Sequence, residues 1–381
     1  MLSPEQCKDR MKRFITRLQA QQLDLAVVAN TKNIAYLTGF LRPDMGVGDM
    51  KATLLLVYPD RGPILLNSTM FKALAEKTYQ GETVIYTDYD IRGKMVTHLE
   101  EALVALRERL STTGNAPKHI GVESRYLPLS VADLLRELYP AATISDVSGE
   151  ILHMRRIKDE DEIALIRQSE VQIALGYKSV KEAIAEGKTE IDALLAGTAA
   201  LTKAAGEATF FFGDFVSGER TLEIGGPPTP RVLKNGDLFI FDLWTTTCGY
   251  WADTCRTFVV GARPTPEQVK LHDTVMKAVD AGEKLLKPGV RARDVYQAMY
   301  DAIAAAGYEG HFPHHGGHGI GLHAHETPFF IPGSDDVLEE GMTATLEPGV
   351  YVPGVGGVRS EDNYLITANG PENLTPYPKG L

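Results

Sequence analysis

The chain has 381 residues, of which 44% are hydrophobic and 23% charged, and its net charge is −11. This length exceeds what a single hydrophobic core usually supports, so two domains are expected. The acidic balance argues against a nucleic-acid partner and against an anionic membrane surface, because both bind basic faces. No apolar run is long enough to span a membrane. Cys7, Cys248 and Cys255 are too few and too irregular for a disulfide framework, and no signal-peptide pattern is visible, so a cytoplasmic protein is expected.

The first 150 residues alternate helical and strand patterns, which is typical of an α/β domain. A helix is predicted over residues 11–22 and a strand over 23–30. Residues 52–68 predict a β-hairpin with its turn at Pro59–Gly62. The remaining predicted elements are strands at 82–89, 118–123 and 142–148 and a helix at 129–139.

A charged cluster that contains Arg155, Arg156 and Lys158 marks the junction, and the predicted domains are residues 1–150 and 151–381. The helix that follows opens on acidic residues, which its dipole favours. Its apolar positions share one face; they are Ile163, Ile166, Ile173, Tyr177 and Val180.

The rest of the second domain predicts one α/β unit. Residues 236–261 predict two strands joined by a short turn. A helix is predicted at 265–286, with Thr265 as N-cap and Gln268 as its capping-box partner. A second helix is predicted at 290–307 and ends at Gly307. Paired strands are predicted at 343–352 and 356–367.

Acidic residues interrupt the apolar strands of this domain. Asp242 follows "LFIF", Asp253 lies in "GYWADTCRTF", Glu347 in "TATLEPG" and Glu361 in "GGVRSED". A carboxylate is costly to bury unless it is paired or bound to a cation. Together with His318 in "GGHGIG", these side chains form the kind of set that holds two divalent metal ions. One histidine and four carboxylates suit Mn²⁺ and tolerate Co²⁺ or Zn²⁺.

These five segments resemble the motifs of the pita-bread metallopeptidases, which include methionine aminopeptidase, aminopeptidase P, prolidase, creatinase and some lyases. Residues 23–40, "LDLAVVANTKNIAYLTGF", are similar to the creatinase-type N-terminal domain of aminopeptidase P and prolidase, which methionine aminopeptidase lacks. Residues 154–170 are similar to the start of the catalytic domain. The resemblance covers nearly the whole chain and implies an α/β creatinase-type N-terminal domain, a pita-bread catalytic domain and a homodimer.

The resemblance also implies roles for individual residues. The metal ligands would be Asp242, Asp253, His318, Glu347 and Glu361. His325 would contact the substrate carbonyl and stabilise the oxyanion, and Glu347 would carry a proton to the leaving amine. His314 would line the site, and Arg359 would lie beside the bridging carboxylate. His323 matches no such role, and a packing function is expected for it.

Two positions depart from the family pattern. Peptidases of this family carry a histidine seventeen residues before the first aspartate, where it holds the substrate on the C-terminal side of the cleaved bond; this chain has Gly225 there. Trp244 replaces a small residue two positions after Asp242, and the sequence leaves open whether its ring points into the site or away from it.

The leading hypothesis is therefore a dinuclear-metal Xaa-Pro peptidase, either a dipeptidase or an aminopeptidase, that acts on small peptides. The alternative is a non-peptidase enzyme on the same scaffold, an amidohydrolase or lyase acting on a small charged metabolite, because function must be argued from the site rather than from the fold. A binding protein with a vestigial site is the third hypothesis, and the complete set of ligand positions argues against it.

Overall fold

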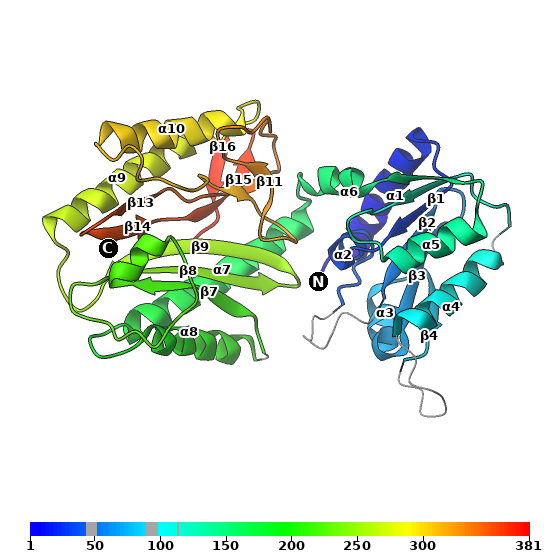
Figure 1. Cartoon of the computed structure of the whole chain (residues 1–381), viewed down its shortest axis with the longest axis horizontal. Coiled ribbons are helices and arrows are strands. Elements are labelled where there is room, and N and C mark those ends of the chain that lie inside the picture. Colours follow the sequence, from blue (N-terminus) through cyan, green and yellow to red (C-terminus); the bar gives the residue numbers. More distant parts are fainter. Residues whose placement is uncertain (43–51, 89–97, 113, 207) are drawn as a thin grey trace. The chain divides into compact units, whose positions relative to one another are not determined.

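The computed structural model describes residues 1–42, 52–88, 98–112, 114–206 and 208–381 (Figure 1). The chain divides into two compact units, Met1–Arg155 and Arg156–Leu381. Within the described ranges, no helix combines the length and the apolar character needed to cross a bilayer.

The first unit is built on one sheet, with strands β1 (Leu25–Val28), β2 (Leu54–Tyr58), β3 (Gly62–Ser68), β4 (Glu82–Tyr86), β5 (His119–Val122) and β6 (Thr143–Asp146). The strand order is β4-β3-β2-β1-β5-β6. β2 and β3 form the predicted antiparallel hairpin, and β1 pairs antiparallel with β2 but parallel with β5. Position 89, the end of one predicted strand, lies outside the described residues.

The helices of this unit are α1 (Pro4–Ala20), α2 (Thr31–Thr38), α3 (Lys72–Thr78), α4 (His98–Ser111), α5 (Leu129–Leu138) and α6 (Ser148–Arg155). The first helix begins before its predicted start because Ser3 accepts a hydrogen bond from the backbone N–H of Gln6 and caps it. Helices and strands together make the α/β unit that the sequence predicted, although helices α2, α3, α4 and α6 were not predicted.

The second unit begins with α7 (Glu160–Ala183) and α8 (Glu190–Ala205), followed by an antiparallel sheet of β7 (Phe211–Ser217), β8 (Leu238–Thr247) and β9 (Tyr250–Val259). Four of the apolar positions predicted to share a face of α7 are buried, and Ile163 is half-buried. The turn between β8 and β9 has positive φ angles at Cys248 and Gly249, the geometry that suits a two-residue hairpin.

Two more helices follow, α9 (Pro266–Glu283) and α10 (Ala292–Ala305). The predicted capping box at Thr265 and Gln268 is confirmed, since each side chain accepts a hydrogen bond from the backbone N–H of the other. Gly307 follows the C-cap residue of α10 with a φ of 86°, a conformation that favours glycine.

The remaining strands are β10 (His318–Gly319), β11 (Glu326–Phe329), β12 (Thr343–Leu346), β13 (Gly349–Val352), β14 (Gly356–Arg359), β15 (Asp362–Thr367) and β16 (Gly370–Asn373). They form a sheet in the order β11-β10-β12-β15-β16 and a separate β13-β14 pair. The strand pairs predicted near the C-terminus are confirmed, because β12 pairs with β15 and β13 with β14.

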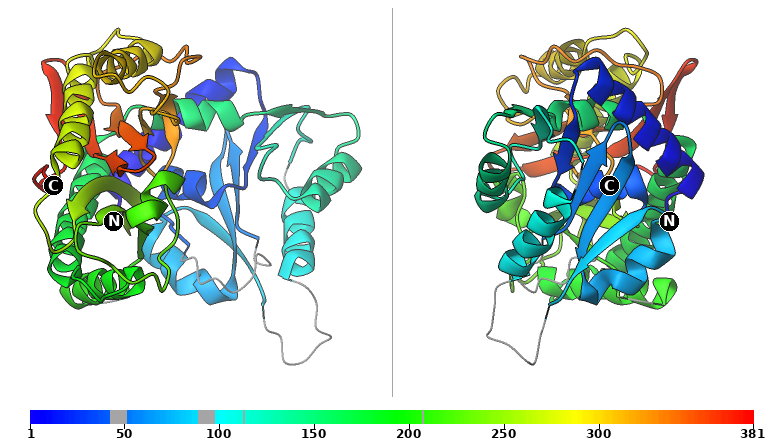
Figure 2. Two further views of the ribbon diagram at one scale, coloured as in Figure 1. Left: turned by 60° about the vertical axis from the view of Figure 1, so that its left-hand side comes forward. Right: turned by 90° about the vertical axis from the view of Figure 1, so that its right-hand side faces the viewer.

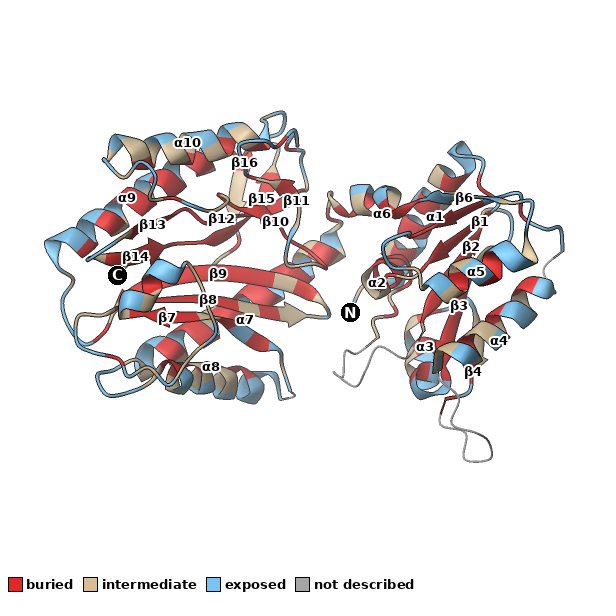
Figure 3. Cartoon of the chain, in the orientation of Figure 1, coloured by how far each residue is buried: buried red, intermediate tan, exposed pale blue. Residues whose placement is uncertain are grey.

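The strands of the second unit lie between two pairs of helices. Helices α7 and α8 lie on one side, and α9 and α10 lie on the other (Figure 1 and the left view of Figure 2). Figure 3 shows that the strands between them are mostly buried, whereas the helices are exposed on their outer faces. Most side chains that project from the strands toward the middle of this unit are therefore shielded from water.

Candidate metal centre

Backbone hydrogen bonds draw together the strands that carry the predicted ligands. The N–H of Glu361, between β14 and β15, donates to the carbonyl of Cys255 on β9 at 2.9 Å. The N–H of Glu347, after β12, donates to the carbonyl of Gly316 at 2.9 Å, just before His318 on β10. Residues more than a hundred positions apart thus meet in one buried region.

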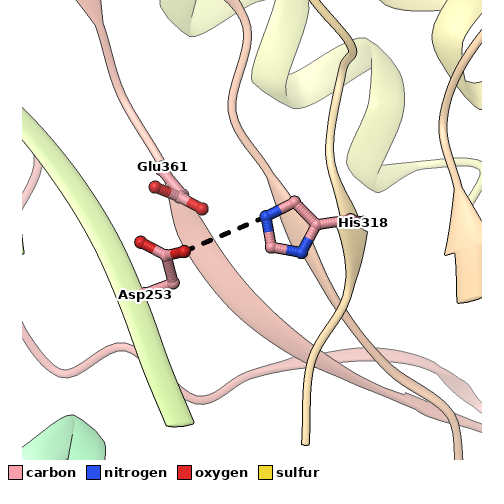
Figure 4. A group of neighbouring side chains, drawn as sticks. All are labelled: Asp253, His318 and Glu361. Carbon is pink, nitrogen blue, oxygen red and sulfur yellow. Dashed lines mark ion pairs between the residues drawn. The ribbon is translucent and has the colours of Figure 1, made fainter. Parts of the chain in front are cut away.

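Three of the predicted ligands form a compact donor cluster. Asp253, His318 and Glu361 each offer a ligand atom within 4.8 Å of the others, and all three are buried (Figure 4). The Nε2 atom of His318 lies 3.9 Å from Asp253 Oδ2 and 3.3 Å from Glu347 Oε1. Its Nδ1 donates to the carbonyl of Gly319 at 3.0 Å, so the lone pair is on Nε2 and points at the carboxylates.

Asp242 completes the group. Its Oδ2 accepts a hydrogen bond from Arg359 Nη2 at 2.8 Å, and after burial its negative charge is the next cause that raises the pKa of Asp253. The structure therefore brings all five predicted ligand positions together and places Arg359 beside one of the carboxylates.

The hydrogen bonding of these side chains gives structural evidence, independent of the sequence motifs, that they fit divalent metal ions. Among the predicted ligands, four buried carboxylate oxygens have no hydrogen-bond partner in the part of the chain that the structure describes: Asp242 Oδ1, Asp253 Oδ1 and both oxygens of Glu361. Buried polar atoms are nearly always satisfied in folded proteins. One imidazole and several carboxylates are ligands that Mn²⁺ and related ions accept, so these residues fit such ions.

The pKa values of the side chains in this cluster are shifted by burial and by the neighbouring charges. Burial, and after it repulsion from neighbouring carboxylates, raises the pKa of Asp253 and Glu361 well above the usual range, and it raises that of Glu347 to about 8. Burial also lowers the pKa of His318 well below its usual value, which keeps the imidazole neutral. Without a cation, the site therefore holds protons that a metal ion would displace.

His325 lies against the cluster from the solvent side. Its ring centroid is 3.9 Å from that of His318, while the residue as a whole is exposed. His315, which the sequence analysis did not single out, places Nδ1 3.4 Å from Glu347 Oε1. Thr345 Oγ1 donates to the same oxygen at 3.1 Å. His325 is thus an accessible imidazole beside His318, while Thr345 holds the Glu347 carboxylate by a hydrogen bond.

His314 occupies a different position from His325. Its Nδ1 donates to the carbonyl of His315 at 2.8 Å, so Nε2 accepts the hydrogen bond from the Tyr351 hydroxyl at 2.9 Å. Burial lowers its pKa to about 3. Both ring nitrogens are engaged within the protein, and in this arrangement His314 contributes by holding Tyr351, which in turn accepts a hydrogen bond from Arg359 Nη1 at 3.0 Å.

The glycines beside His318 have a structural explanation. A Cβ atom at Gly317 would overlap the carbonyl of Thr345, and one at Gly319 would overlap the carbonyl of Thr327. Gly317 also has a φ of 148°. The glycines allow close packing of β10 against its neighbours, which fixes His318 in place.

His323 lies in the turn that precedes β11. Its N–H donates to Glu326 Oε1 at 2.8 Å, and its Nδ1 lies 3.8 Å from the same oxygen. Glu326 in turn lies 3.6 Å from the buried Lys158 Nζ. These contacts tie His323 to the turn that carries His325.

Asp214 is a site residue that the sequence analysis missed. It lies on β7 opposite Asp242, and its Oδ2 accepts a hydrogen bond from Arg359 Nη2 at 3.0 Å. Its Oδ1 accepts a hydrogen bond from the N–H of Gly226 at 2.8 Å, and a Cβ atom at Gly225 would overlap its carboxylate. The space that a side chain at position 225 would enter is thus occupied by Asp214. Burial, and then Asp242, raises its pKa.

The orientation of Trp244 is settled by strand alternation. Leu243 is buried in the core that α7 and α8 cover, so Asp242 and Trp244 project from the opposite face of β8. Trp244 pairs with Asp253 across β8 and β9. Its side chain therefore lies on the face of the sheet that carries the candidate ligands.

Two family models match the chain. Residues 164–368 match "Metallopeptidase family M24", and residues 10–157 match "Creatinase/Prolidase N-terminal domain". The chain belongs to metallopeptidase family M24, and its second unit has the pita-bread fold that the sequence predicted.

Similar proteins cover the chain almost completely. "Putative dipeptidase YkvY" of Bacillus subtilis (strain 168) is 31% identical over 379 residues, 98% of this chain and 99% of that protein. The prolidase of Pyrococcus horikoshii OT3 has a TM-score of 0.83 at 26% identity, and the Xaa-Pro dipeptidase of Bacillus anthracis has a TM-score of 0.84 at 25%. Both structural matches cover 98% of this chain and 99% of the other.

We predict that neutralising Glu361 and neutralising the adjacent Asp362 have opposite effects on the free energy of unfolding of the metal-free protein. Without metal, Glu361→Gln should raise the free energy of unfolding by about 1 kcal/mol, because it removes a buried carboxyl group with unpartnered oxygens. In Mn²⁺, the same variant should lose most of the stabilisation that metal gives the wild type. Urea unfolding with EDTA and with Mn²⁺, together with metal analysis, measures both effects.

Asp362→Asn is the matched control. Arg256 and Lys379 each lie 2.6 Å from the Asp362 carboxylate, and this variant should cost about 3 kcal/mol with or without Mn²⁺ while its metal content stays normal. If Glu361→Gln binds metal as the wild type does, Glu361 is not a ligand.

Metal binding should release protons. The raised pKa values of Asp253, Glu347 and Glu361 mean that the metal-free site is partly protonated at neutral pH, so apparent affinity should rise between about pH 6 and pH 8. Titration calorimetry with Mn²⁺ at pH 7, in buffers of different ionisation enthalpy, reports the number of protons released. A heat of binding that is the same in every buffer would contradict the expected proton release.

Proposed function

We propose that this chain hydrolyses Xaa-Pro bonds in small peptides with two divalent metal ions, most suitably Mn²⁺, held by Asp242, Asp253, His318, Glu347 and Glu361. The observation that carries the proposal is a neutral imidazole that faces buried carboxylates, four of whose oxygens have no hydrogen-bond partner among the described residues. The names of the similar prolidase and Xaa-Pro dipeptidase structures support the choice of substrate.

The metal ions, when bound, would polarise the scissile carbonyl and lower the pKa of a water molecule to near neutrality. Arg359 would orient Asp242 by its 2.8 Å hydrogen bond to Oδ2, which leaves the unpartnered Oδ1 of Asp242 available to a metal ion. Glu347 is suited to accept a proton from water and deliver it to the leaving amine. Its carboxylate is buried, accepts a hydrogen bond from Thr345 and lies 3.4 Å from His315 Nδ1, and such a group transfers protons well when its pKa lies near the working pH.

His325 is suited to stabilise the oxyanion. Its ring rests against His318 and remains accessible to a substrate. Because burial lowers its pKa, the imidazole is neutral at pH 7 and one ring nitrogen carries a proton to donate. A hydrogen-bond donor aimed at the developing oxyanion typically contributes about 10²- to 10³-fold to kcat.

One observation favours a second candidate function. The space beside Gly225 is occupied by the Asp214 carboxylate, which offers acceptors where a peptidase of this family offers an imidazole. A carboxylate there suits a substrate that presents a positively charged nitrogen. A non-peptidase amidohydrolase or lyase that acts on a small charged metabolite is therefore the alternative.

We expect Mn²⁺-loaded wild type to cleave Xaa-Pro dipeptides and His325→Ala to lower kcat by about 10²- to 10³-fold at unchanged metal content. His323→Ala is the matched control and should stay within about twofold, since its backbone N–H, which the substitution keeps, makes the hydrogen bond to Glu326 in the turn. Initial rates on Ala-Pro and Leu-Pro, with metal analysis of each variant, measure this difference.

Two results would count against these assignments. Full metal occupancy with no cleavage of any Xaa-Pro peptide would overturn the peptidase proposal in favour of the alternative. Equal loss of kcat in His325→Ala and His323→Ala would show that the turn as a whole matters, and not the imidazole of His325.

A further inference from the structure

The face of the β7–β9 sheet that bears the candidate ligands also bears aromatic rings. Phe211 and Leu243 pack into the core under the helices, so Phe212 and Trp244 project from the other face. Phe212 pairs with Trp244 across β7 and β8, and Trp244 pairs with Asp253 across β8 and β9. The Phe212 and Trp244 ring centroids are 6.1 Å apart.

A second aromatic pair continues this surface. Trp251 precedes Asp253 by two residues on β9, so both side chains project from the same face. Its ring lies 5.4 Å from that of Phe210 in an edge-to-face arrangement. Trp244 and Trp251 are the two tryptophans of the chain, so tryptophan fluorescence reports on this surface alone.

These rings are partly exposed to solvent. Phe212 is 37% exposed, Phe210 is 49% exposed, and Trp244 and Trp251 are half-buried. Apolar surface gains roughly 25 cal/mol for each Å² removed from water, and aromatic rings add contact energy of their own. An exposed aromatic surface that borders a polar, buried site is a typical position for a ligand's apolar group.

We propose that Phe212 and Trp244 are specificity-determining residues that select substrates with an apolar group next to the scissile bond. This inference rests on the proposed function and adds to it the class of peptide. Trp244 lies beside Asp253 through direct cross-strand pairing, where paired side chains are about 5 Å apart. A group packed on this ring is therefore adjacent to the reacting bond.

The Asp214 carboxylate beside these rings should disfavour acidic substrates. Asp214 projects from the same face of β7 as Phe212, two positions along the strand. An acidic substrate side chain placed on the rings would lose hydration and approach the Asp214 carboxylate. The expected order of preference is therefore aromatic or large aliphatic groups first, glycine next and acidic residues last.

The test uses Mn²⁺-loaded enzyme and two series of dipeptides. The first varies the residue before proline: Phe-Pro, Leu-Pro, Gly-Pro and Asp-Pro. The second compares Leu-Pro with Leu-Ala, which removes the proline ring. Trp244→Gly and Phe212→Ser should each lower the preference for the apolar partner by about 10-fold, measured as a ratio of kcat/KM values. Leu195→Ser is the control, because Leu195 is a comparably exposed apolar residue of α8, on the helix-covered side.

A binding readout accompanies the rates. In Trp251→Phe, Trp244 is the single tryptophan, and its emission should change on rapid mixing with Leu-Pro, with a concentration dependence that follows KM. Gly-Pro at the same concentrations should change it less. Metal content of every variant should equal that of the wild type, since neither ring is a ligand.

Each outcome separates the hypotheses. A loss confined to the first series places the residue before proline on the rings, and a loss confined to the second places the proline ring there; both support the inference. Equal losses for all peptides, or unchanged ratios, overturn it while Xaa-Pro cleavage by the wild type leaves the proposed function standing. If the wild type cleaves no Xaa-Pro peptide, the proposed function fails and this inference fails with it.

Discussion

Four carboxylates that face one another in the interior of the second unit are the constraint on which the site depends. Asp242, Asp253, Glu347 and Glu361 are all buried, and two like charges a few ångströms apart repel strongly in a medium of low dielectric constant. Arg359 offsets part of this repulsion through Asp242, and the raised pKa values show that protons offset more in the absence of a cation. The antiparallel pairs of strands, tied by the backbone bonds at Cys255 and Gly316, hold the group in place. The fold therefore supports an arrangement that favours divalent cations.

Much of this architecture could be predicted from the sequence, because local signals agreed with it. The hairpin at residues 52–68, the capping box at Thr265 and the strand pairs near the C-terminus all follow from short-range patterns. Asp242, Asp253, Glu347 and Glu361 were identifiable because a carboxylate inside an apolar strand requires an explanation. The family resemblance assigned ligand roles to these four residues and His318, and the structure brings the five together.

Other features depend on pairing between distant segments, which periodicity does not reveal. Strand β7 was not predicted; its Gly213 has no side chain because the backbone of Asp242 lies against it. Asp214 therefore had no visible partner until β7 was placed opposite β8. The sequence showed that Gly225 and Trp244 depart from the family pattern, but only the structure shows what surrounds these two positions. Asp214 occupies the space beside Gly225, and strand alternation turns Trp244 toward the candidate ligands.

The most direct measurement is anomalous diffraction from crystals of the protein grown with excess Mn²⁺. The account predicts two anomalous peaks about 3.5–4 Å apart, a spacing typical of two-metal sites, with Asp242, Asp253, His318, Glu347 and Glu361 as ligands. It also predicts that Trp244 lines the space beside them. Manganese peaks elsewhere, or these five side chains more than about 5 Å from any ion, well beyond coordination distance, would contradict it.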